Sequence, residues 1–113
     1  MKFAALVLVI AHLVGGGAGF FAGDAVPERM YPIGMDLKGH ELTTITVTGH
    51  GQGDMDCYLY KGSFRTHDAV FVTRDTSNAN GCTLTVNPES DAHMTLLVQN
   101  TGEKPQHYTV VVQ

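Results

Sequence analysis

The sequence predicts an all-β protein, an antiparallel β-sandwich of about seven short strands that follows an N-terminal signal peptide. Two observations predict the sandwich. Apolar and polar residues alternate with a period of two in several short runs that are rich in Val, Ile and Thr. Gly, Asn and Pro separate these runs as turn residues, and no segment after residue 26 shows a helical period with caps.

Four strands are expected in the first half of this domain. A weak strand covers residues 33–37, and residues 42–48 place Ile and Val on one face and threonines on the other. Residues 55–60 place Met, Cys and Leu inward and two tyrosines outward. Residues 69–73 form a further short apolar run.

Three more strands are expected in the second half. Residues 82–86 alternate Cys, Leu and Val with threonines, and residues 94–99 and 108–113 alternate in the same way. The intervening segments carry the residues that favour turns: residues 38–40, 49–53, 61–63, 78–81, 87–88 and 100–102.

The first twenty-five residues have the layout of a secretory signal peptide. A positive start at Lys2 precedes an almost wholly apolar run over residues 3–14, and small residues at Gly23 and Ala25 suit a cleavage site near Ala25. The alternative is an uncleaved membrane anchor, because residues 3–23 are long enough to span a core of about 30 Å. We expect residues 1–25 to be the signal peptide and residues 26–113 to be an exported domain, periplasmic or secreted.

The two cysteines, Cys57 and Cys82, are expected to form a disulfide. An even pair in an exported protein favours a bridge, and a domain this small gains from one because it buries little surface. Two buried free thiols are the alternative. The net charge of −4, from 7 Lys and Arg against 11 Asp and Glu, makes nucleic acid a poor partner.

Two stretches resemble the bacterial pre-peptidase C-terminal domain family. Residues 48–60 read TGHGQGDMDCYLY, and residues 76–113 run from TSNANGCTLTVNP through MTLLVQNTG to HYTVVVQ. The similarity covers roughly residues 31–113 and is to small exported members that carry this domain alone with two cysteines. It implies a jelly-roll-like sandwich and a role as a binding or secretion accessory, and some relatives bind calcium or polymeric substrates.

Three carboxylates are candidate calcium ligands. Asp54 and Asp56 lie two residues apart at the entry to a strand, so their side chains share one face about 6–7 Å apart. Asp75 begins a polar loop that a Cys57–Cys82 bridge would bring near them. Carboxylate and backbone oxygens are the ligands that Ca²⁺ takes. The alternatives are that Asp54 and Asp56 cap the Gly-rich turn and that residues 75–81 form a hairpin loop around Asn80-Gly81.

Tyr58 and Tyr60 are candidate ligand-binding residues, because both point outward on one strand and could contact a sugar or a peptide. Packing against the second sheet is the alternative. No HExxH or GxSxG motif and no thiolate nucleophile is expected, so we predict no enzymatic activity. The histidines are expected to be surface residues that share no metal.

The sequence therefore predicts a non-catalytic extracytoplasmic accessory or binding module. Its partner would be an exported protein or a glycan, and a membrane would enter only through an uncleaved signal peptide. The alternatives are a Ca²⁺-stabilised structural domain and a peptidase-associated inhibitor or chaperone that acts in trans. Calcium is the one cofactor the sequence suggests.

Overall fold

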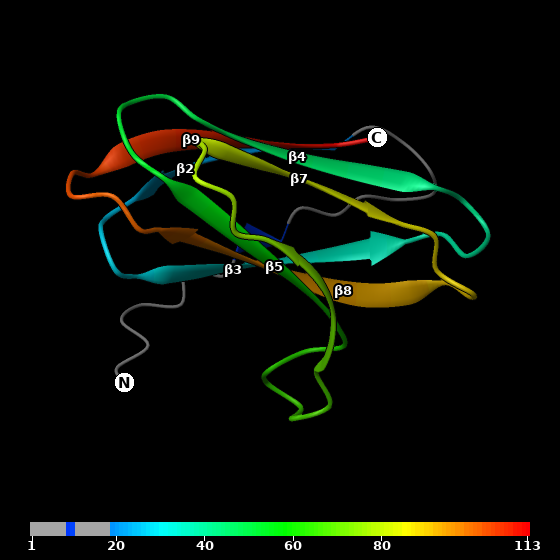
Figure 1. Ribbon diagram of the computed structural model, residues 1–113. Helices are drawn as coiled ribbons and strands as arrows, with labels where there is room; N and C mark the ends of the chain where they lie inside the picture. Colours follow the sequence, from blue (N-terminus) through cyan, green and yellow to red (C-terminus); the bar gives the residue numbers. More distant parts are fainter. Residues whose placement is uncertain (1–8, 11–18) are drawn as a thin grey trace.

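The computed structural model describes residues 9–10 and 19–113, which form two β-sheets packed face to face (Figure 1). The five-stranded sheet has the order β1-β3-β8-β5-β6 and the four-stranded sheet the order β2-β9-β4-β7. No helix occurs among these residues. The predicted all-β sandwich is confirmed. The strands are β1 (Val9–Ile10), β2 (Gly19–Ala25), β3 (Met30–Leu37), β4 (Thr43–Gly49), β5 (Met55–Lys61), β6 (Val70–Asp75), β7 (Gly81–Val86), β8 (Ala92–Asn100) and β9 (Gln106–Val112).

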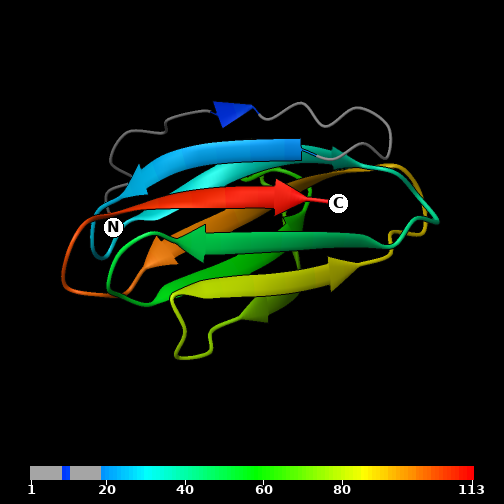
Figure 2. The same ribbon diagram turned by 90° about the horizontal axis from the view of Figure 1, so that it is seen from above.

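The pairing within each sheet is antiparallel except where β1 runs parallel to β3. The four-stranded sheet is the upper layer in Figure 1, and the view from above shows β2, β9, β4 and β7 side by side in front of the other sheet (Figure 2). The strands alternate buried and exposed side chains, as period-two sequences dictate. The part of the chain that the structure describes holds no helix that is long and apolar enough to cross a membrane.

The core lies between the sheets and receives the inward residues of β3, β4, β5, β7, β8 and β9. Tyr108 is the largest fully buried side chain. Its ring meets Phe21 edge-on at a centroid distance of 6.0 Å and Tyr31 at 6.3 Å. Burial of the phenol raises the pKa of Tyr108 well above its ordinary value.

β1 and β2 both lie within the predicted signal peptide of residues 1–25. β2 pairs with β9 along its whole length, from Gly19 opposite Val112 to Ala25 opposite Gln106. Ala25 is completely buried, and its carbonyl accepts a hydrogen bond from the Asn100 side-chain amide at 3.0 Å. Cleavage near Ala25 would therefore remove a strand of the sandwich. The remainder of the predicted leader lies outside the described residues, and the signal peptide stays a prediction.

β6 differs from the other predicted strands because its apolar side chains are not covered. It forms the end of the five-stranded sheet, and β5 is its neighbour. Val70, Phe71 and Val72 are 63%, 51% and 39% exposed. The loop that joins β5 to β6 extends beyond the body of the sandwich (Figure 1). Gly62 begins this loop with φ = 92°, a left-handed conformation that favours glycine.

Candidate functional site

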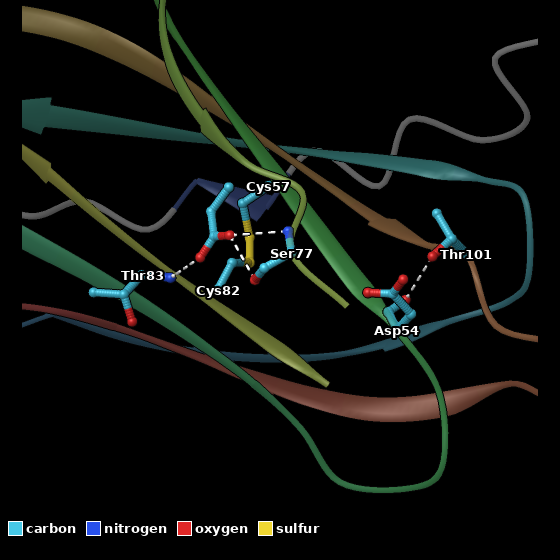
Figure 3. The surroundings of a disulfide bond; sticks show 7 residues. Asp54, Cys57, Ser77, Cys82, Thr83 and Thr101 are labelled. Atoms are coloured by element: carbon cyan, nitrogen blue, oxygen red, sulfur yellow. Dashed lines mark hydrogen bonds between the residues drawn. A yellow bond between two sulfur atoms is a disulfide. The ribbon is translucent and has the colours of Figure 1, made fainter. Parts of the chain in front are cut away.

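The predicted disulfide between Cys57 and Cys82 is confirmed, and it joins the two sheets (Figure 3). Cys57 belongs to β5 of the five-stranded sheet and Cys82 to β7 of the four-stranded sheet. The two Cα atoms lie 6.1 Å apart, and both residues are buried. The bridge therefore clamps the sandwich where β5 and β7 face each other.

The loop between β6 and β7 is organised by Asp75. One carboxylate oxygen accepts hydrogen bonds from the Ser77 backbone N–H at 3.1 Å and the Ser77 hydroxyl at 2.8 Å, and the other accepts from the Thr83 N–H at 3.0 Å. The Thr83 bond, followed by those from Ser77, lowers the pKa of Asp75. Ser77 and Thr83 flank the disulfide in Figure 3. These contacts are those of a loop-organising carboxylate.

Asp54 and Asp56 lie at the start of β5 and carry free carboxylate oxygens. Asp56 is only 9% exposed, and the Oδ1 atoms of both residues are buried with no hydrogen-bond partner among the described residues. Burial raises the pKa of Asp56, and the neighbouring carboxylates of Asp54 and Asp75 raise it further. The backbone carbonyl of Asp54 accepts from the Thr101 N–H at 2.9 Å. Asp54 and Thr101 lie together in Figure 3, away from the disulfide.

The three predicted calcium ligands therefore differ in whether their carboxylate oxygens already have hydrogen-bond partners. Asp54 and Asp56 offer unpartnered oxygens, whereas the Asp75 carboxylate is occupied by its own loop. Across residues 9–10 and 19–113, no three His, Cys, Asp or Glu side chains come together as a metal-binding group. The carboxylates of Asp54 and Asp56 could supply part of an oxygen ligand set and would need backbone oxygens to complete it.

A polar cluster that the sequence did not reveal fixes the Gly-rich segment of residues 49–53. The Gln106 amide donates to the Asn80 side-chain oxygen at 2.7 Å, and the Asn80 amide donates to the Gly51 carbonyl at 2.6 Å. A Cβ at Gly49 would lie 2.4 Å from that Asn80 oxygen and 2.6 Å from Gln106 Oε1. A side chain at Gly49 would therefore have to displace these two amides from their hydrogen bonds.

The outer side of the five-stranded sheet carries an aromatic cluster, formed by Tyr60, Phe64 and Phe71. The Tyr60 ring meets Phe64 at a centroid distance of 4.8 Å and Phe71 at 5.7 Å, both edge-on. Tyr60 and Phe71 are cross-strand neighbours. Tyr58 lies on the same face, one pleat along, opposite Arg74. Cys57 and Leu59, which alternate with the two tyrosines, face the core, so Tyr58 and Tyr60 do not pack on the second sheet.

The segments around the aromatic cluster carry charges of both signs, with three carboxylates, on Asp56, Asp68 and Asp75, and as many cations. Three of the seven Lys and Arg residues, Lys61, Arg65 and Arg74, lie on β5, the following loop and β6, and all three are exposed. A surface that combines exposed aromatic rings with cations is suited to contacts with a protein or a carbohydrate.

Two histidines that are far apart in the sequence, His50 and His107, lie side by side, which the sequence did not predict. The rings of His50 and His107 lie 5.8 Å apart, although 57 positions separate them in the printed sequence. His107 Nδ1 lies 3.0 Å from Asp24 Oδ1, and His50 Nε2 lies 3.0 Å from the Thr109 hydroxyl. Pairing of β9 with β2 places His107 beside Asp24, and pairing of β9 with β4 places His50 beside His107 and Thr109. No local signal in the sequence could have shown these long-range contacts.

The class of protein that these features define is an all-β sandwich with a disulfide between its sheets and an exposed aromatic cluster. No protein-family model matches the sequence, and no curated protein sequence matches it. Among solved structures, the fold is similar to the pre-peptidase C-terminal domain of a collagenase from Bacillus anthracis, with a TM-score of 0.70 at 12% identity. That alignment covers 94% of this chain and 96% of the other.

Two periplasmic inhibitors of g-type lysozyme share the fold as well. PliG of Aeromonas hydrophila aligns with a TM-score of 0.55 at 13% identity, over 94% of this chain and 96% of the inhibitor. PliG of Salmonella Typhimurium aligns with a TM-score of 0.51 at 18% identity, over 93% and 95%. At these identities the similarity establishes the shared fold.

Proposed function

We propose that this chain is an exported, non-catalytic protein-binding module of the pre-peptidase C-terminal type. The observation that carries the proposal is the aromatic cluster of Tyr60, Phe64 and Phe71, which lies on the solvent side of a sheet whose core is already complete without it. Large aromatic residues outside the core are typical of binding surfaces. The fold neighbours support a module of this kind, because one belongs to a collagenase and two are inhibitor proteins.

Binding would use the rings as anchors and Arg74 as a specific polar contact. Phe71 is half-exposed and Tyr60 is partly buried beside it, and the two rings hold each other edge-on, so little side-chain freedom is lost when a partner covers them. Arg74, beside Tyr58 on the same face, can donate to a partner's carboxylate in a bidentate manner. The module would then favour a partner surface that combines an apolar patch with acidic residues. An exported protein fits this description better than an uncharged glycan does.

A g-type lysozyme is the first partner to test, since two fold neighbours inhibit that enzyme. Lysis of bacterial cell walls by g-type lysozyme would be followed at rising concentrations of this protein, with binding measured by calorimetry in parallel. Stoichiometric inhibition, lost in the Tyr60→Ser/Phe71→Ser variant and kept in Leu42→Ser, would identify the partner and the surface. Leu42 is the matched control because it is 69% exposed and precedes β4 on a different part of the fold. Binding that is equal in all three proteins would contradict the assignment of the surface.

A second candidate, a calcium-stabilised domain, is favoured by the buried unpartnered oxygens of Asp54 and Asp56. Thermal melts with calcium and with a chelator test it. Calcium at one hundred times its dissociation constant would add about 2.7 kcal/mol, which raises the melting temperature of a small domain by about 10 °C. The increase should disappear in Asp56→Asn and persist in Asp75→Asn. Identical melts with calcium and with the chelator would remove calcium from consideration.

A further inference from the structure

Asp24, His107 and His50 form a row across the outer face of the four-stranded sheet. Asp24 in β2 lies directly opposite His107 in β9. His50, the residue after β4, donates its backbone N–H to the His107 carbonyl at 2.8 Å. The three strands lie side by side in Figure 2. Their neighbours Ala25 and Tyr108 are buried, whereas the three residues of the row are exposed, so the row faces solvent.

The separation of the two imidazole rings in this row matches the separation at which two histidines share one metal ion. Zn²⁺ binds histidine nitrogens at about 2.0–2.1 Å in a tetrahedral shell, which places the centres of two ligating rings about 5–6 Å apart. The ring centres of His50 and His107 lie 5.8 Å apart, with their planes inclined by 37°. Spacing along the sequence predicted that the histidines share no metal, whereas strand pairing sets these two at the distance that a shared ion requires.

His107 has the hydrogen bond that orients many metal-ligating histidines. Its Nδ1 lies 3.0 Å from Asp24 Oδ1, so the neutral ring donates its Nδ1 proton to the carboxylate and keeps a lone pair on Nε2. Ligating histidines commonly donate their other N–H to a carboxylate, which fixes the ring and raises the basicity of the ligating nitrogen. The His107 side chain is 51% exposed and that of Asp24 is 86% exposed, so an ion can reach this ring from solvent.

From these contacts we propose that His50 and His107 form a binding site for a divalent transition-metal ion of the Zn²⁺ or Cu²⁺ type, with Asp24 as a positioning residue. His50 Nε2 lies 3.0 Å from the Thr109 hydroxyl, and this exposed hydrogen bond can be exchanged for a metal bond at small cost. Imidazole suits these ions, whereas Ca²⁺ and Mg²⁺ take oxygen ligands. Two protein ligands leave positions for water or for a ligand from a partner protein.

A second Asp–His pair, on the other sheet, provides a matched control within the chain. His93 Nδ1 lies 3.0 Å from Asp36 Oδ1, the same contact that Asp24 makes with His107. The residues beside His93 on the neighbouring strands are Asp36 and Gly62, so its strand neighbours supply no second imidazole. His93 therefore has the carboxylate without the second ring. The aromatic cluster also belongs to that sheet, so the metal site stands independently of the proposed partner protein.

The test is calorimetric titration of the disulfide-bonded protein, prepared without a histidine tag, with zinc chloride and with copper chloride. We expect one ion per chain, with copper bound more tightly than zinc. His50→Ala and His107→Ala should each raise the zinc dissociation constant at least about tenfold, and Asp24→Ala should raise it about tenfold through loss of the orienting carboxylate. His93→Ala should bind zinc like the wild type. The melting temperature of Asp24→Ala without metal should stay close to that of the wild type, because its side chain is exposed.

The position of the ion is tested separately by nitrogen-15 NMR of the imidazole side chains. Zinc should shift the ring signals of His50 and His107 and leave those of His93 in place, and an excess of calcium should not reverse the shifts. Circular dichroism establishes that the variants fold. A protein that binds neither zinc nor copper would overturn the proposal, as would zinc binding that His50→Ala and His107→Ala leave intact. Failure to bind lysozyme with zinc binding retained would count against the proposed partner alone.

Discussion

Asp75 at the end of β6 accepts a hydrogen bond from the backbone N–H of Thr83 in β7, at 3.0 Å. This contact joins the outermost strands of the two sheets beside the disulfide between Cys57 and Cys82. The sequence suggested a calcium ligand at Asp75, which stays a prediction; in the structure its carboxylate accepts hydrogen bonds from Ser77 and Thr83. Its carboxylate holds the loop that leads from one sheet to the other.

Replacement of Asp75 by alanine should destabilise the protein by about 1–3 kcal/mol, because the Thr83 and Ser77 N–H groups lose their acceptor. The pKa of Asp75 also determines how its contribution to folding stability changes with pH. The pKa of Asp75 is lowered in the folded state, so its contribution is full above its ordinary pKa of 3.8 and is lost as the pH falls through the folded value.

Urea denaturation of both proteins at neutral pH and in acid measures this difference. The free energies of unfolding of the wild type and the variant should converge in acid. A separation that stayed constant as the pH fell would contradict the role of the carboxylate.

Replacement of Asp56 by asparagine should stabilise the protein at neutral pH when a chelator is present. Burial and the nearby carboxylates raise the folded-state pKa of Asp56, so the folded protein holds its proton more tightly than the unfolded chain. Stability therefore falls as the pH rises from the ordinary value of 3.8 through the folded pKa. The variant should melt above the wild type at pH 7 and lose that advantage in acid. A variant that melts lower than the wild type at pH 7 without calcium would contradict a destabilising role for the Asp56 charge.

Loss of the disulfide should cost about 3.5 kcal/mol. The bridge closes a loop of 25 residues in sequence separation, and the chain-entropy relation assigns that value to a loop of this size. The Cys57→Ala/Cys82→Ala variant, compared with the oxidised wild type in urea, measures it. Because the bridge joins the two sheets, we expect one cooperative transition in both proteins. Two separate transitions in the variant would mean that the sheets fold independently.

A chain that begins at Val26 should be less stable than one that begins at Gly19, by at least about 3 kcal/mol. Removal of β2 uncovers Tyr108 where Phe21 packs on it, and the Asn100 amide loses the Ala25 carbonyl. Denaturation of the two chains measures the difference. We therefore expect the exported protein to retain β2, which the intact mass of the processed chain would show. Equal stabilities of the two chains would again favour the prediction of cleavage near Ala25.

Much of the fold could be predicted from local sequence, because period-two alternation and turn residues mark strands directly. The strands predicted at residues 42–48, 82–86 and 108–113 correspond to β4, β7 and β9, with every boundary within two residues. β2 was missed because its Gly, Phe and Ala residues continue an apolar leader, and pairing with β9 is a long-range contact. The exposure of β6 could not be predicted from its apolar run, because a sequence does not show which strand lies at the edge of a sheet.

The site was only partly predictable for the same reason. Tyr60 could be placed on the outer face from alternation alone, whereas Phe64 and Phe71 join it through the β5–β6 pairing. The Asn80–Gln106 contact depends on the meeting of two loops far apart in sequence. Its one trace in the sequence is the glycine spacing at Gly49, Gly51 and Gly53, which the close approach of these amides explains.

The central claim is that the aromatic cluster of Tyr60, Phe64 and Phe71 is the binding surface of a non-catalytic module. The most direct test is a comparative capture of exported proteins by three immobilised baits: the wild type, Tyr60→Ser/Phe71→Ser and Leu42→Ser. We predict that at least one protein binds the wild type and the Leu42 variant in stoichiometric amount and does not bind the double variant. Recovery of the same proteins by all three folded baits would contradict the claim.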